Sequence, residues 1–378
     1  MTLYKLRSGH AGEAFLGEIT GRRDAVLIAP LTTTRFIAAA LVVFYHSGAT
    51  WVLSHPQAPA VLRTLLLNFY VSVTYFFTLS GFILHFTYRG GVVGAAKWKN
   101  YGVARFARIY PVYLLAVLAM LPFARWRGLS DLPQFLLIHW WLPDHLWHWR
   151  AWNLPTWTLS IEFFLYLCFP FLSRLIAGLE SRWVWATIAA AGIFVLVSGS
   201  AAIFANSEGR YGWMLWTPIP LLRLPEFVIG ICAGELHLRR EGRRFPVPSW
   251  LLALLLLAGL CISRAQWVAG FTTLTAAAFM SAVASERNTR LARFLSVRAF
   301  VLLGGASYAF YLFHQPAHFA MLRLAGGSKL ILALQYPVLL ASALLIFLLV
   351  EEPAREWVRK RAGMKRSVIG EAVALPAG

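Results

Sequence analysis

The sequence predicts an all-α protein that crosses a membrane about ten times. Of its 378 residues, 59% are hydrophobic and only 13% are charged, whereas soluble domains carry about a quarter charged residues. Apolar runs of roughly 15 to 25 residues recur along nearly the whole chain, and about 20 apolar residues are enough to cross a bilayer as a helix. Helices are expected because backbone groups in hydrocarbon must be hydrogen-bonded within their own segment.

The apolar runs divide into ten predicted spans. They cover 31–53, 64–86, 107–123, 157–179, 183–205, 215–238, 249–263, 268–285, 299–323 and 330–350. A further apolar stretch, Leu132–Leu142, is too short to cross a bilayer, so we expect a half-helix or an interfacial segment there.

The basic residues predict the orientation of these spans. With ten spans, one side of the membrane carries 25 Lys and Arg residues and the other carries 8. Lys and Arg are enriched in cytoplasmic loops, so both termini are expected in the cytoplasm. The net charge of +19 is therefore explained by topology, and no nucleic-acid partner is expected.

The chain is expected to hold one membrane domain, residues 31–355, between a cytoplasmic segment 1–30 and a basic cytoplasmic tail 356–378. Its three cysteines lie inside apolar runs without CxxC or Cys/His spacing. No metal site and no disulfide framework is therefore expected.

Ionisable side chains at membrane depth are expensive, and each is a candidate site residue. Arg35 and His46 lie 11 residues apart in the first span, nearly three helical turns, so they share one face about 16 Å apart. A ligand that is anionic at one end and reactive at the other would fit both, as a coenzyme A thioester does. Alternatively, Arg35 reaches lipid phosphate and His46 bonds a neighbouring helix.

A pair of arginines precedes the third span. Arg105 and Arg108 share one face at the start of a helix, where guanidinium forks and the helix dipole together favour phosphate. Lipid headgroups are the alternative ligand. In the second span, Ser80-Gly81 would let another helix or a ligand approach closely.

Other polar residues within the predicted spans are further candidates for the site. Glu162, in the outer half of the fourth span, is expected to orient His46 or to bind a sugar hydroxyl; a structural salt bridge is the alternative. Arg223 and Glu226 can pair with each other at i, i+3 or contribute to acceptor binding. The ninth span carries a polar stripe on one helix face, formed by Ser307, Tyr311 and His314. Its two hydroxyls are candidate donors of hydrogen bonds to an oxyanion. His314 is either catalytic or a hydrogen-bonded core residue.

Several motifs occur in a recognisable order. They are Arg35-x10-His46, Phe76-Phe77-Thr78-Leu79-Ser80-Gly81-Phe82, Arg105-x-x-Arg108, Trp157-Thr158-Leu159-Ser160-x-Glu162 with Phe164, Tyr166 and Pro170, Arg223 with Pro225-Glu226-Phe227 and Gly230, Ser307-Tyr308-x-x-Tyr311-Leu312-x-His314-x-Pro316, and Glu351-Glu352-Pro353. Together they resemble the acyltransferase-3 family of bacterial integral-membrane O-acyltransferases.

The resemblance implies an enzyme of the bacterial inner membrane that takes an acyl group, most simply acetyl, from cytoplasmic acyl-CoA. By the same resemblance, His46 matches the essential histidine, expected as general base, and Arg35 its partner. Arg105 and Arg108 match the arginine pair associated with the donor. The absence of a C-terminal hydrolase-like domain is typical of the exopolysaccharide and nodulation-factor branch. The expected acceptor is therefore a hydroxyl of an exopolysaccharide or of its lipid-linked saccharide precursor.

Other assignments remain open from sequence. The acceptor could be peptidoglycan, lipopolysaccharide or a small hydroxylated metabolite, and the donor could carry succinyl or a longer acyl group. A ping-pong route through acyl-histidine is a second mechanism. A transporter or flippase is the rival class, because buried Arg, His and Glu also mark substrate paths in carriers. The oligomeric state is not determined.

Overall fold

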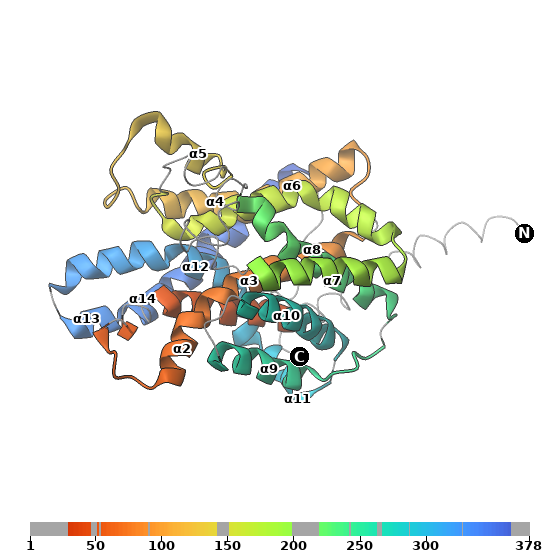
Figure 1. Cartoon of the computed structure of the whole chain (residues 1–378). Helices are drawn as coiled ribbons and strands as arrows, with labels where there is room; N and C mark the ends of the chain where they lie inside the picture. The colour runs from red at the N-terminus through yellow and green to blue at the C-terminus, as the bar shows by residue number, and fades with distance from the viewer. Residues whose placement is uncertain are drawn as a thin grey trace, which may run out of the picture.

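The computed structural model describes residues 29–46, 51–52, 54–89, 91–141, 151–198, 219–241, 243–262, 267–286, 288–326 and 328–363. These residues form helices and connecting turns and contain no strand, which confirms the all-α prediction (Figure 1). Residues 199–218, which hold the end of the fifth predicted span and the start of the sixth, lie outside the described residues.

Each of the ten predicted spans overlaps a helix in the described part of the chain. The helix of the third span begins earlier than predicted, at Ala95, so Arg105 and Arg108 lie inside it, and the expectation that they lie at a helix start is wrong. The helices are the first helix over 29–46, α2 (Ala60–Asn68) continued by η1 (Phe69–Val71) and α3 (Ser72–Tyr88), α4 (Ala95–Leu118), α6 (Trp157–Gly178), α7 (Ser181–Ser198), α8 (Ile219–Arg239), α9 (Ser249–Ile262), α10 (Trp267–Ser285), α12 (Arg298–Ala325), and α14 (Gln335–Ile346) continued by η7 (Phe347–Glu351) and α15 (Glu352–Arg361).

Six helical segments among the described residues are long and apolar enough to cross a membrane. They are Ala60–Tyr88, Ala95–Leu118, Leu154–Gly178, Ser181–Ser198, Trp267–Ser285 and Gln335–Arg361. The chain is therefore a multi-pass helical membrane protein. In the short apolar stretch, helix α5 covers only Leu132–Phe135, after the 3₁₀ helix η2 (Gly128–Asp131). The remaining short elements are η4 (Leu154–Thr156), α11 (Arg290–Leu295) and α13 (Lys329–Ala333).

Helices α3 and α8 touch through their backbones. A Cβ atom on Gly81 would lie 2.2 Å from the Phe227 carbonyl oxygen, and one on Gly230 would lie 2.0 Å from the Thr78 carbonyl oxygen. Small residues permit such contacts between membrane helices. The expectation that Gly81 lets another helix approach closely is confirmed.

Polar clusters join α3 to α8 on both sides of this contact. At one end, the Glu235 carboxylate accepts hydrogen bonds from Arg89 at 3.0 Å and Arg239 at 2.7 Å and lies 2.7 Å from His85. At the other end, Glu226 accepts hydrogen bonds from Thr74 on α3 and from Arg223. Buried charges are tolerated when they are paired and hydrogen-bonded in this way.

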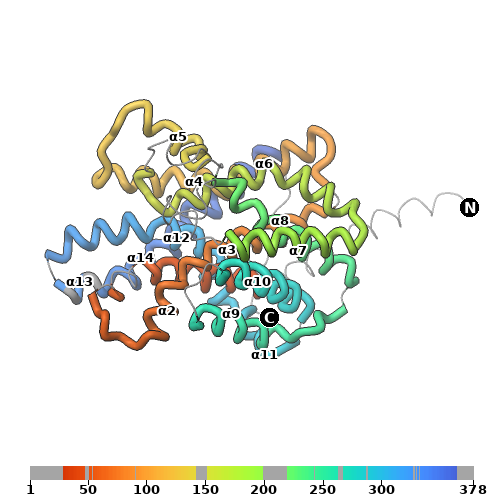
Figure 2. Tube along the Cα trace, in the orientation of Figure 1, coloured from red at the N-terminus to blue at the C-terminus, as the bar shows by residue number. Residues whose placement is uncertain are grey.

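The first helix packs against α12 and α14, so segments from the two ends of the described chain lie side by side (Figure 2). A Cβ atom on Gly304 of α12 would lie 2.2 Å from the Thr32 carbonyl oxygen. Farther along, the ring centroids of Phe36 and Phe310 are 5.3 Å apart. This packing carries His46 to α12.

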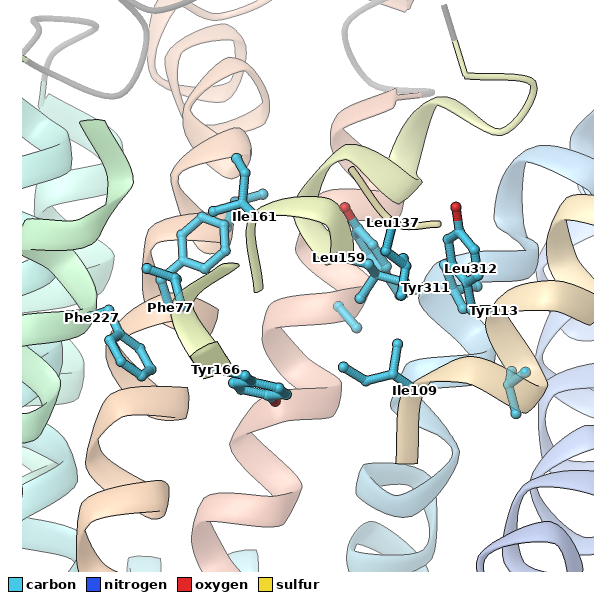
Figure 3. Close-up of a cluster of buried hydrophobic side chains, with 14 of the residues drawn as sticks. Phe77, Ile109, Tyr113, Leu137, Leu159, Ile161, Tyr166, Phe227, Tyr311 and Leu312 are labelled. Carbon is cyan, nitrogen blue, oxygen red and sulfur yellow. The ribbon is translucent and has the colours of Figure 1, made fainter. Parts of the chain in front are cut away.

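The largest core cluster lies where α3, α4, α6 and α12 converge. Figure 3 shows Phe77, Ile109, Ile161 and Leu312 at this point, and each is at most 4% exposed. Well-packed apolar side chains fix the relative positions of these helices. The polar residues on the same four helices are therefore held at defined positions.

We predict that Gly230→Ala lowers the thermal stability of the detergent-purified protein. The added methyl group would meet the Thr78 carbonyl oxygen, and such overpacking costs roughly 1 to 3 kcal/mol. Gly102→Ala, also within a helix but with open space around a Cβ, is the matched control. Equal melting temperatures for the two variants would contradict the assigned contact.

Candidate active site

A cavity of about 410 Å³ is lined by the first helix, α3, α4, α6, α12 and α15. We call it the arginine cavity, because four arginines line it, Arg35, Arg105, Arg108 and Arg359. Glu162 is the one acidic residue among its described lining side chains. The structure thus brings together four of the predicted site residues, Arg35, Arg105, Arg108 and Glu162, and adds Arg359.

None of these four guanidinium groups forms an ion pair with an acid of the described residues at salt-bridge distance. Arg105 instead lies over the ring of Tyr166, 5.5 Å from its centroid, and over those of Tyr88 and Tyr101 at 5.9 Å. Its Nε atom is buried without a hydrogen-bond partner. The lining therefore carries an excess of positive charge, which an anionic ligand could balance.

Glu162 belongs to the arginine cavity. Its carboxylate accepts hydrogen bonds from Ser80 at 3.2 Å and from Tyr166, one turn further along α6. Arg35 is within electrostatic range of the same carboxylate. Glu162 and His46 line different cavities, so the structure gives no support to the expectation that Glu162 orients His46.

A second cavity, of about 480 Å³, contains His46. We call it the histidine cavity, since three histidines from two helices line it, His46 of the first helix and His314 and His318 of α12. The His46 and His314 rings are stacked with their centroids 5.0 Å apart. No Asp, Glu, Lys or Arg is among its described lining residues.

A hydrogen bond of His314 determines which of its two ring nitrogens carries the hydrogen. Its Nδ1 lies 2.5 Å from the Tyr311 carbonyl oxygen. A carbonyl oxygen only accepts hydrogen bonds, so Nδ1 carries the hydrogen and Nε2 of the neutral ring is left as the acceptor. The alternative expected from sequence, a hydrogen-bonded histidine, is therefore correct, and the same ring also lines the histidine cavity.

A thin layer separates the two cavities. The Tyr311 hydroxyl is 3.1 Å from the Pro155 carbonyl oxygen and 3.2 Å from the Thr158 hydroxyl. Tyr311 and Thr158 line the arginine cavity, whereas Pro155 lines the histidine cavity. Figure 3 shows Tyr311 beside Leu159, which lines the arginine cavity as well. Tyr311 thus joins the lining of one cavity to that of the other.

The predicted stripe on α12 is divided between the cavities. Ser307 and Tyr311 line the arginine cavity, and His314 lines the histidine cavity. The Ser307 hydroxyl donates to the Gly304 carbonyl oxygen at 2.7 Å. Both hydroxyls line the arginine cavity but donate their hydrogens to the Gly304 and Pro155 carbonyl oxygens, and neither shares a cavity with His46.

Arg223 and Glu226 form the ion pair that their spacing predicts, with 2.7 Å between Arg223 Nη1 and Glu226 Oε1. Both are buried, and the Arg223 guanidinium lies over the rings of Phe77 and Trp157. Neither residue lines either cavity. The structure therefore favours the structural alternative over a role in acceptor binding.

Several lining residues were not predicted as site residues, among them Tyr166, which was expected only as part of the family motif. Tyr166 follows Glu162 by one helical turn, and that spacing was a usable signal of its place in the cavity. His318 follows His314 by one turn in the same way, and its Nδ1 lies 2.9 Å from Gln335 Oε1. Arg359 had no such signal, because it lies in the segment expected to be a basic tail. The predicted boundary at residue 355 falls inside α15.

Comparison with known proteins identifies the class of this site. A family model described as an acyltransferase domain matches residues 30–352. The chain is 32% identical over 349 residues to "Acyltransferase MdmB" of Streptomyces mycarofaciens, covering 86% of this chain and 87% of the relative. No solved structure matches. The chain therefore belongs to the acyltransferase-3 family, and its activity is acyl transfer.

We predict that Glu162→Gln lowers the melting temperature of the ligand-free protein and increases its stabilisation by added pyrophosphate. The change removes the acid that lies among the four arginines, and an anion that binds the folded state then has more repulsion to relieve. Thermal-shift measurements with and without pyrophosphate test this. Glu180→Gln, at an exposed ion pair, is the control; the same pyrophosphate response in both variants would contradict the electrostatic assignment.

Proposed function

We propose that this protein transfers an acyl group, most simply acetyl, from cytoplasmic acyl-CoA to a hydroxyl of an acceptor that enters from the outer side of the bacterial inner membrane. The observation that carries the proposal is the pair of adjoining cavities, one lined by four arginines and the other by stacked histidines. An anionic donor needs positive charge around it and a neutral acceptor does not, so each cavity suits one of the two substrates.

The arginine cavity suits the donor. Coenzyme A carries phosphates at its nucleotide end, and guanidinium groups bind phosphate through two parallel hydrogen bonds. Arg105 and Arg108, one turn apart on α4, would hold the phosphates, and Arg35 would extend the positive charge inward. The pantetheine arm would then run past Ser80 toward Ser307 and Tyr311, which line the same cavity.

The histidine cavity suits the acceptor. Without charged residues in its described lining, it favours a neutral hydroxylated group such as a sugar ring. The side chain of His46 is exposed at this cavity. An imidazole titrates near neutral pH and is a natural base for a hydroxyl. The acceptor would be an exopolysaccharide or its lipid-linked precursor; lipopolysaccharide, peptidoglycan or a small hydroxylated metabolite presents the same hydroxyl chemistry.

The chemical step joins the two cavities. The acceptor oxygen attacks the thioester carbonyl carbon while His46 takes the hydroxyl proton. The oxyanion would be stabilised by a hydroxyl such as that of Tyr311, which would exchange its hydrogen bond to the Pro155 carbonyl oxygen for one to the oxyanion. The carbon–sulfur bond then breaks, the proton passes to the departing thiolate, and the products are an ester and free coenzyme A. The thioester must reach the layer formed by Tyr311 and Thr158, so this layer is where donor and acceptor meet.

We predict that His46→Ala lowers transfer by roughly 10² to 10⁴-fold, the usual contribution of a general base, with little change in melting temperature. The readout is acyl transfer to a hydroxylated acceptor, followed by mass spectrometry of the ester. His55→Ala, outside both cavities, is the control. Full transfer by His46→Ala would exclude this residue as the base.

We also predict that Arg105→Ala and Arg108→Ala each weaken acetyl-CoA binding by about tenfold or more, because each removes hydrogen bonds to a charged group. Arg293→Ala removes the same charge from an exposed position on α11 and should bind normally. Titration of the detergent-purified protein with acetyl-CoA, succinyl-CoA and free coenzyme A measures the affinities. Folded wild-type protein that binds none of the three would contradict acyl-CoA as the donor.

A further inference from the structure

The C-terminal helix α15 contributes to the arginine cavity although it begins where the family match at residue 352 ends. It continues α14 through the π-helical turn η7 and packs against α4. Arg359 lines the cavity from this helix, together with Tyr88 at the end of α3 and Arg105 on α4. By the charge-derived topology, this end of the cavity faces the cytoplasm.

Arg355, one helical turn before Arg359, anchors α15. It is 7% exposed, and its guanidinium binds Glu351 at 2.6 Å and also Glu352. These two ion pairs join Arg355 to the start of the helix and hold α15 in place.

The three basic residues that end α15 have different surroundings. Lys360 lies 3.9 Å from Glu356, and the Arg361 guanidinium lies 4.8 Å from the Trp357 ring centroid. Arg359 forms no ion pair with an acid of the described residues, and it is the one of the three that lines the cavity. Residues 355 and 359 share a face at i, i+4 spacing, so the anchor at Arg355 sets the direction of Arg359.

We propose that Arg359 binds a phosphate of the acyl-CoA nucleotide and forms a clamp with Arg105 and Arg108 on α4, while Arg355 is a positioning residue. This inference rests on the proposed function. Two arginines from one helix reach neighbouring phosphate oxygens, whereas an arginine from a second helix holds the nucleotide from another direction. Coenzyme A carries a pyrophosphate and a separate 3′-phosphate, so it has one anionic group for the arginines of α4 and another for Arg359 of α15.

The test compares binding of two thioesters to the full-length protein in detergent. Acetyl-CoA has the phosphates, and acetyl-pantetheine has the same thioester without them. Arg359→Ala should weaken acetyl-CoA binding about tenfold and leave acetyl-pantetheine binding unchanged. Arg359→Lys should recover part of the loss, because it restores the charge without the fork. Lys360→Ala, one residue away and outside the cavity lining, should bind both as the wild type does.

Each other outcome overturns a specific statement. If Arg359→Ala binds acetyl-CoA as tightly as the wild type does, the proposed clamp is contradicted, whereas the proposed function is not. An equal loss of both thioesters would mean that Arg359 acts through the fold and not through a phosphate. Equal weakening by Lys360→Ala would assign the effect to general positive charge. Failure of the wild type to bind either thioester would instead overturn the proposed function.

Discussion

The backbone contact between α3 and α8 is the constraint on which the rest of the structure depends. Gly81 and Gly230 allow carbonyl oxygens and Cα atoms to meet directly, and paired acids join the two helices on both sides of that contact. With one face of α3 fixed in this way, Ser80 and its neighbours are turned to the arginine cavity. Contacts of this kind suit a membrane, where apolar side chains gain little by leaving lipid for protein and close packing supplies the attraction.

The placement of acids explains the charge of that cavity. Glu226, Glu235 and Glu351 are each buried in contact with an arginine outside the lining set. Glu162 is left as the acid among the described lining residues, opposite four arginines. The protein thus uses most of its buried carboxylates to join helices and leaves an excess of positive charge where an anionic ligand can balance it.

Division into two cavities has a chemical consequence. In the proposed function, a charged donor and a neutral acceptor would be held apart until their reactive groups meet at the layer containing Tyr311 and Thr158. The stacked histidines would then lie on the acceptor side of the layer, and the arginines on the donor side. Such a division suits transfer across a membrane, since neither substrate has to pass through the whole protein.

The sequence by itself determined the helical membrane class, the positions of the spans, the helix that carries each ionisable residue, and the family motifs. These follow from hydropathy, charge and spacing, which are properties of single segments. Only the tertiary structure separated Glu162 from His46, divided the stripe on α12 between two cavities, and brought Arg359 from the expected tail to Arg105. The physical reason is that distances between helices depend on how glycines and aromatic side chains of different segments pack together, and the spacing within one segment does not contain that information.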